Sequence, residues 1–166
     1  ELRYASLLHD FGKVGVKENV LLKANKLHAS RFDYLVLKIE WQKQLLEKRF
    51  YQELLTSNEY SQQQKVVLIS QLKAFDFSQL SKTSSSGVRD FVHQIQQLDE
   101  FKSVLMNANQ PTINQQNLSV DLNDMVNYKM HAEFPFESSL LSESDFLSLS
   151  IKKGSLTDGE RQEIQS

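Results

Sequence analysis

Apolar residues recur at helical spacing along most of the chain, and this pattern predicts an all-α fold. Between residues 30 and 56, and again between 88 and 106, apolar side chains return every three or four residues, as on one face of an amphipathic helix. In the first helix the expected buried face consists of Phe32, Leu35, Ile39, Leu46, Phe50 and Leu54. In the second it consists of Val88, Phe91, Val92, Ile95, Leu98, Phe101 and Leu105. Two such long amphipathic helices predict a hairpin or a small bundle.

Capping residues indicate where several helices begin. Ser30, with Asp33 three residues later, is a candidate N-cap for the first long helix, and Ser142 with Asp145 repeats that spacing before a short apolar segment. The T-x-x-E capping box that starts at Thr157 predicts a last helix.

Shorter elements complete the prediction. Helices are expected over 2–10, 61–75 and 122–130, whereas 107–117, which holds Pro111 and four asparagines, is expected to be a loop or an exposed strand-like link. Gly154 is placed to close a turn before the last helix.

Composition excludes several classes of function. The chain has no cysteine, which excludes disulfides, thiolate zinc sites and a cysteine nucleophile. Its formal net charge of −2 does not indicate a basic surface for nucleic acid or a membrane. No apolar run approaches the roughly 20 residues that span a bilayer, and the start of the chain does not resemble a signal peptide. We therefore expect a cytoplasmic protein that contacts neither nucleic acid nor a membrane.

His9 and Asp10 are the residues whose arrangement most clearly suggests chemistry. They are adjacent at the end of the helix predicted over 2–10, where a frayed turn would let both reach one metal ion. Imidazole nitrogen and carboxylate oxygen suit iron, manganese or zinc, and Lys13 would neutralise a phosphate oxygen in the same pocket. The pair alone is also compatible with a histidine that the dipole of a helix favours at its C-terminus.

The surrounding residues resemble the signature of the HD-GYP domain, a family within the HD superfamily of metal-dependent phosphohydrolases. Residues 7–16 read L-L-H-D-F-G-K-V-G-V, against the family's L-L-H-D-I-G-K-I-G-I, and residues 19–23 read N-V-L-L-K, against the start of I-L-x-K-P-G-K-L-T. The resemblance implies metal ligation by His9 and Asp10 and a phosphate contact by Lys13. It also implies divalent metal ions (Fe, Mn or similar, two in a complete domain) and a cyclic di-GMP phosphodiesterase activity in bacterial signal transduction.

A second segment resembles the family at the other end of the chain. Residues 153–164 are similar to K-P-G-K-L-T-x-E-E-x-x-x-I, an element that residues 22–27 already resemble in part. We interpret 1–25 and 149–166 as parts of an HD-GYP core that is truncated at both ends, and 26–148 as a helical insertion. The family's other ligand histidines and its G-Y-P loop find no match, so this segment alone is expected to be inactive.

The insertion is expected to pack on the core or on a second subunit, which would give a homodimer. A coiled-coil arm is the less favoured form, because three unbroken heptads are not evident. Two other functions stay open: an HD-superfamily nucleotide phosphohydrolase, and a non-catalytic signalling or dimerisation module with a degenerate HD domain.

Several other residues are assigned to ordinary structural roles. His28, His93 and His131 are isolated, and isolated histidines are rarely metal ligands. Trp41 is expected in the core or an interface. A mild acidic cluster is expected to form a solvated face rather than a calcium loop; its members are Asp121, Asp124, Glu133 and Glu137.

Overall fold

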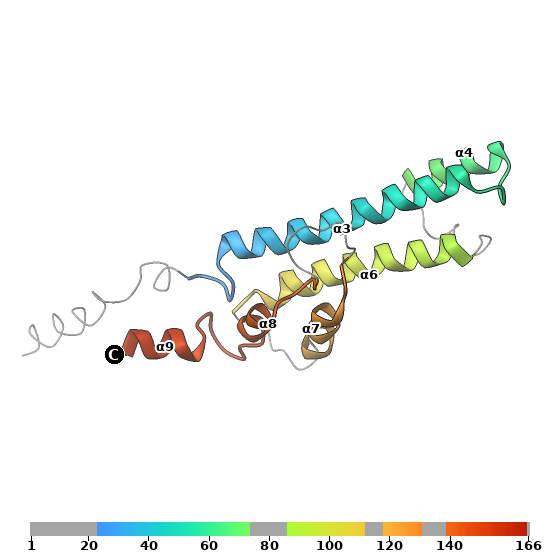
Figure 1. Ribbon diagram of the computed structural model, residues 1–166. Helices are drawn as coiled ribbons and strands as arrows, with labels where there is room; N and C mark the ends of the chain where they lie inside the picture. The colour runs from blue at the N-terminus through green and yellow to red at the C-terminus, as the bar shows by residue number, and fades with distance from the viewer. Residues whose placement is uncertain (1–22, 74–85, 112–117, 131–138, 166) are drawn as a thin grey trace, which may run out of the picture. The chain divides into compact units, whose positions relative to one another are not determined.

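A computed structural model describes residues 23–73, 86–111, 118–130 and 139–165 of the 166-residue chain (Figure 1). Over these residues the protein is all-α, as the sequence predicts, and the described part contains no strand beyond a single antiparallel bridge between Lys129 and Ser139. The helices are α3 (Ala29–Thr56), α4 (Gln62–Lys73), α6 (Ser86–Ala108), α7 (Leu118–Asn127), α8 (Glu143–Leu149) and α9 (Asp158–Gln165).

The chain divides into two compact units, and each unit combines segments that are distant in sequence. One, which we call the junction unit, contains the described residues within 23–35, 104–129 and 139–165. The other, the hairpin unit, contains the described residues within 36–103, together with residue 130. The first turns of α3 and the last turns of α6 therefore belong to the junction unit.

Two antiparallel helices, α3 and α6, form the hairpin of the hairpin unit, which also contains α4 (Figure 1). The rings of Phe50 and Phe91 stack with their centroids 4.3 Å apart. Nearer the start of α3, Glu40 Oε1 accepts a hydrogen bond from Lys102 Nζ at 2.6 Å. Because the partner's number falls as the residue number along α3 rises, the two helices run in opposite directions.

The apolar periods of the sequence predict the buried faces of these helices well. All seven predicted positions of α6 are buried, and five of the six predicted positions of α3 are buried as well, with Phe32 half-buried. The buried face of α3 is wider than predicted, because Lys38, Gln42 and Leu45 are also buried. Beside its apolar stripe, α3 therefore also buries the side chains of two polar residues, Lys38 and Gln42.

The helix α4 begins at a capping box formed by Ser61 and Gln64, an S-x-x-Q pattern that the sequence contains. The Ser61 N–H donates to Gln64 Oε1 at 2.9 Å, and the Gln64 N–H donates back to Ser61 Oγ at 3.3 Å. Lys65, in the first turn of α4, is buried and its ammonium donates to the carbonyls of Leu55 and Ser57 at 2.9 and 2.7 Å. Lys65 thus satisfies carbonyl oxygens at the C-terminal end of α3, which have no partner within the helix.

Three predicted boundaries are wrong. Ser30 is not an N-cap, because α3 begins at Ala29 and the N–H groups of Arg31 and Phe32 both donate to the carbonyl of His28 at 3.0 Å. The loop predicted from residue 107 starts later, because α6 continues to Ala108. The reason is packing, since Ala108 is fully buried and continues the apolar face beyond the predicted end. The helix predicted over 122–130 begins earlier and ends at Asn127.

Trp41, which is expected in the core or an interface, does not lie in the core. Its side chain is 45% exposed. It follows the buried Ile39 by two positions, and two positions on an α-helix correspond to opposite faces.

Candidate functional site

The residues predicted to bind metal and phosphate, His9, Asp10 and Lys13, lie outside the described residues, as do the helix expected over 2–10 and His131. Within the ranges that the structure describes, no group of three or more His, Cys, Asp or Glu side chains is placed to hold a metal ion. His93 is exposed and His28 is half-buried. The described part of the candidate site is the segment that follows the motif, from Lys23 onward.

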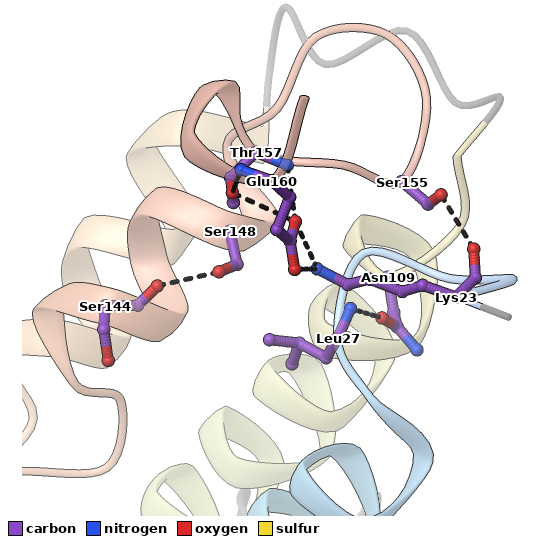
Figure 2. A network of polar contacts seen from close by, with 8 residues as sticks. All are labelled: Lys23, Leu27, Asn109, Ser144, Ser148, Ser155, Thr157 and Glu160. Atoms are coloured by element: carbon purple, nitrogen blue, oxygen red, sulfur yellow. Dashed lines mark hydrogen bonds and ion pairs between the residues drawn. The ribbon is translucent and has the colours of Figure 1, made fainter. Parts of the chain in front are cut away.

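Lys23 is held against the last helix by an ion pair within the junction unit (Figure 2). Its ammonium lies 2.8 Å from Oε1 and 3.0 Å from Oε2 of Glu160, which is 137 positions later in the chain. The Lys23 side chain is only 4% exposed and that of Glu160 is 19% exposed, so the pair is largely shielded from water. The Lys23 carbonyl also accepts a hydrogen bond from Ser155 Oγ at 2.9 Å.

Glu160 is positioned by the capping box that the sequence predicts. The Thr157 N–H donates to Glu160 Oε2 at 2.7 Å, and the Glu160 N–H donates to Thr157 Oγ1 at 3.3 Å. Upstream, Gly154 turns the chain with a φ of +84°, a conformation that side chains disfavour. The local sequence therefore fixes the glutamate, and the same carboxylate serves both the helix cap and Lys23.

The charge of Glu160 is favoured by its partners. Burial by itself raises the pKa of Glu160, but the hydrogen bonds from Lys23 and from Thr157 outweigh it and bring the pKa below its ordinary value of 4.5. Glu160 is therefore ionised at neutral pH, and the ion pair with Lys23 is intact there.

Lys26 is a second buried lysine of the junction unit. It is fully buried, and its ammonium donates to the Leu149 carbonyl at 3.2 Å. Burial lowers the pKa of Lys26 below its ordinary value of 10.5, because the charged form loses its hydration. Asn109 secures the backbone here: its carbonyl accepts from the Lys26 N–H at 3.0 Å and its side-chain Oδ1 accepts from the Leu27 N–H at 2.8 Å.

A further ion pair joins the start of α3 to α8. Arg31 donates through Nε to Asp145 Oδ1 at 2.9 Å and through Nη2 to Oδ2 at 2.6 Å, a two-bond geometry that suits guanidinium and carboxylate. The guanidinium also lies 4.9 Å from the centre of the Tyr34 ring. Asp145 is the N3 residue of a capping box with Ser142, as predicted.

The pKa of Asp145 reflects these contacts. Burial alone raises it, but hydrogen bonds from Arg31 and Ser142 together with the positive charge of Arg31 lower it below the ordinary value of 3.8. Asp145 therefore stays charged at neutral pH and holds Arg31 in place.

The charged groups of the junction unit hold segments that are distant in sequence against each other. Lys23 and Arg31 contact carboxylates, Lys26 contacts a backbone carbonyl, and no nucleophile is paired with a base among these contacts. Sequence reasoning identified Glu160 and Asp145 as helix caps but missed their partners and missed Lys26 and Asn109. Lysine is usually exposed, so its type alone gave no signal of burial.

The hairpin unit carries a half-open cleft of about 290 Å³. It is lined by Leu46, Arg49, Phe50, Glu53, Gly87, Asp90, Phe91 and Gln94. This lining mixes charges of both signs and holds no histidine, so it does not define a chemistry of its own.

Comparison of the chain with models of protein families, with curated proteins and with solved structures finds no match. None of the helices in the described ranges combines the length and the apolar character that crossing a membrane requires.

Proposed function

We propose that the chain is part of a metal-dependent phosphohydrolase of the HD-GYP type that hydrolyses cyclic di-GMP. The motif in residues 7–23 suggests the chemistry, and one structural observation supports it. The two segments that each resemble the family's K-P-G-K-L-T element lie against each other in the junction unit. Lys23 of the first segment pairs with Glu160 of the second, and its carbonyl accepts from Ser155.

The contact between Lys23 and Ser155 is expected if a long segment is inserted into the K-P-G-K-L-T element of the family. A domain tolerates a long insertion when the two ends of the inserted segment lie close together, because the path of the host chain then changes little. Here residues 23 and 155 share a 2.9 Å hydrogen bond although 132 positions separate them. The proposal therefore keeps 1–25 and 149–166 as core segments, with 26–148 as a helical insertion between them.

The chemistry is assigned to residues of the motif. His9 and Asp10 would hold divalent ions through an imidazole nitrogen and a carboxylate, and Lys13 would neutralise charge on the scissile phosphate. The ions would supply Lewis acidity for hydrolysis of the phosphodiester. Further ligands would come from other parts of the complete protein. The ion pair of Lys23 with Glu160 would position the segment that directly follows Lys13.

The protein would act in the cytoplasm, with a cyclic dinucleotide as its substrate. The helical insertion would join two copies of the chain into a homodimer.

The test is metal content and cyclic di-GMP hydrolysis of the complete protein that carries this chain, compared between wild type and Asp10→Ala. We expect the wild type to contain metal and hydrolyse the substrate, and the variant to lose at least roughly a hundredfold in activity together with its metal, since residues that only support metal ligands already cost about ten- to a hundredfold. The matched control is Asp33→Ala, which removes an exposed carboxylate on α3 and should change neither quantity.

Other results would overturn the proposal in distinct ways. A wild type without metal and without hydrolysis would favour the non-catalytic signalling module. A metal-containing wild type that hydrolyses a different nucleotide but spares cyclic di-GMP would place it elsewhere in the HD superfamily. An Asp10→Ala variant that equals wild type would remove Asp10 from the site.

A further inference from the structure

The outward face of α3 in the hairpin unit carries an unusual row of side chains. Leu37 and Leu55 are 63% and 62% exposed, and Trp41 is 45% exposed. Two exposed polar residues and one half-buried tyrosine lie between them. Together these residues form what we call the outer stripe, which consists of Leu37, Trp41, Gln44, Lys48, Tyr51 and Leu55.

The outer stripe follows heptad geometry. Its members are alternately four and three residues apart, which is the spacing of the contact positions of a coiled coil. At 3.6 residues per turn, the six positions fall within an arc of about 80° on the helix. The arc is centred opposite the buried residues Leu35, Ile39 and Leu46. One helix thus has two faces suited to packing, and α6 covers only one of them.

The order of residues along the outer stripe reads alike from both ends. Around residue 46, Leu37 mirrors Leu55, Trp41 mirrors Tyr51, and Gln44 mirrors Lys48. Aliphatic thus matches aliphatic, aromatic matches aromatic and polar matches polar. A surface with this symmetry is complementary to itself after rotation by half a turn, as an interface with twofold symmetry must be.

We propose that the outer stripe is a homodimer surface on which α3 packs antiparallel against α3 of a second copy, with the twofold axis near residue 46. Leu37 of one copy then meets Leu55 of the other, Trp41 meets Tyr51, and Gln44 meets Lys48. The apolar pairs bury their area at the two ends of the contact, and the amide oxygen of Gln44 accepts from the ammonium of Lys48 at its centre.

The polar centre selects this arrangement over its alternatives. A parallel dimer in register would place Lys48 directly against Lys48 of the second copy, and like charges repel. Sliding the antiparallel pair by one heptad would set Lys48 against Leu37 or Tyr51, which replaces the match of polar with polar by a polar residue against an apolar or aromatic one. Polar residues within an otherwise apolar seam fix register and orientation at a cost in affinity. We therefore expect a dimer that dissociates on dilution.

The inference rests on the proposed homodimer and not on the proposed hydrolytic activity. Oligomeric state and activity are therefore measured on the same samples of the complete protein. A wild type that dimerises but holds no metal would refute the phosphohydrolase and leave the outer stripe standing. An active wild type that stays monomeric would do the reverse.

The first experiment is sedimentation velocity over a range of concentrations for wild type, Leu37→Glu and Trp41→Ala. Both changed side chains are exposed, so far-UV circular dichroism should show unchanged helix content. We expect the dimer to weaken by at least roughly tenfold in each variant, as for aromatic and aliphatic anchors of interfaces. The control is Val66→Glu, which puts the same charge on a 66% exposed residue of α4 outside the outer stripe and should leave the dimer intact. A dimer that resists Leu37→Glu, or that Val66→Glu disrupts equally, would overturn the proposal.

The second experiment tests the orientation of the helices. This experiment uses the 166-residue chain itself, which has no cysteine, so Gln44→Cys and Lys48→Cys each introduce a single thiol. In the antiparallel arrangement the two positions face each other, so mild oxidation of a mixture of the two variants should give disulfide-linked dimers faster than oxidation of either variant alone. Faster linkage within each single variant would indicate a parallel dimer and refute the proposed register.

Discussion

Replacement of Asp145 by asparagine tests the ion pair that joins α3 to α8 in the junction unit. The Asp145 side chain is 6% exposed and accepts two hydrogen bonds from Arg31 and others from Ser142. Asparagine preserves the size of the side chain and one oxygen, but it removes the charge. Its NH2 group, which is a hydrogen-bond donor, would also face a donor of Arg31 or Ser142. The variant should therefore lose at least one charge-assisted hydrogen bond without creating a cavity.

The magnitude follows from the burial of the two partners. Charge-assisted hydrogen bonds contribute about 1.5–3 kcal/mol each, and breaking a fully buried ion pair costs about 3–5 kcal/mol. The Arg31 side chain is 33% exposed, so water can rehydrate part of the guanidinium after the change. We therefore expect Asp145→Asn to lower the free energy of unfolding by about 2 kcal/mol at neutral pH.

Urea unfolding followed by far-UV circular dichroism measures this change. The control is Asp158→Asn, the same substitution at a side chain that is 97% exposed and 3.8 Å from Arg161, where no measurable change is expected. Because the folded-state pKa of Asp145 is lowered, the wild type's advantage should be complete above the ordinary value of 3.8 and should be lost as the pH falls through the lower pKa of the folded state. Equal midpoints for wild type and Asp145→Asn, or an advantage that persists in strong acid, would refute the assigned role of the ion pair.

Three further predictions concern the interior and one turn. Burial lowers the pKa of Lys26, so the free energy of unfolding of the wild type should increase as the pH rises toward 10.5. Lys26→Met should not show this increase and should lose no stability at neutral pH. Urea midpoints measured against pH test this, and parallel curves for the two proteins would contradict it. Phe91→Ala removes the ring stacked on Phe50 and should lower the free energy of unfolding by about 3–4 kcal/mol. Urea unfolding followed by the fluorescence of Trp41, which lies in the same unit, measures this change. A loss below about 1 kcal/mol would show that the stacked rings contribute little to the stability of the core. Gly154→Ala should lower the free energy of unfolding by about 1 kcal/mol through strain in the backbone. A clash does not contribute, because the added Cβ would lie 3.8 Å from the nearest atom, in the side chain of Arg161. An unchanged melting temperature would mean that the turn adopts another conformation.

The helices of the described residues and two of the three predicted caps were accessible from the sequence, because they depend on neighbours within one or two turns. All seven positions that the period of α6 predicted to be buried are buried. The capping boxes that begin at Ser142 and Thr157 were recognised from residues three positions apart. The motif around His9 and Asp10 was likewise a local pattern, and it stays a prediction because those residues lie outside the described part of the chain.

Tertiary structure alone decided which charged residues are buried and which apolar ones are exposed. Whether Lys23 is buried depends on a carboxylate 137 positions away, and no local pattern encodes that distance. Along α3 the apolar period predicted that Ile39 faces inward, but it left Trp41 to the core or an interface, and only the tertiary structure decides that Trp41 faces outward. The physical reason is that helix formation is governed by short-range hydrogen bonds and side-chain spacing, whereas burial is set by whichever distant segment covers the surface.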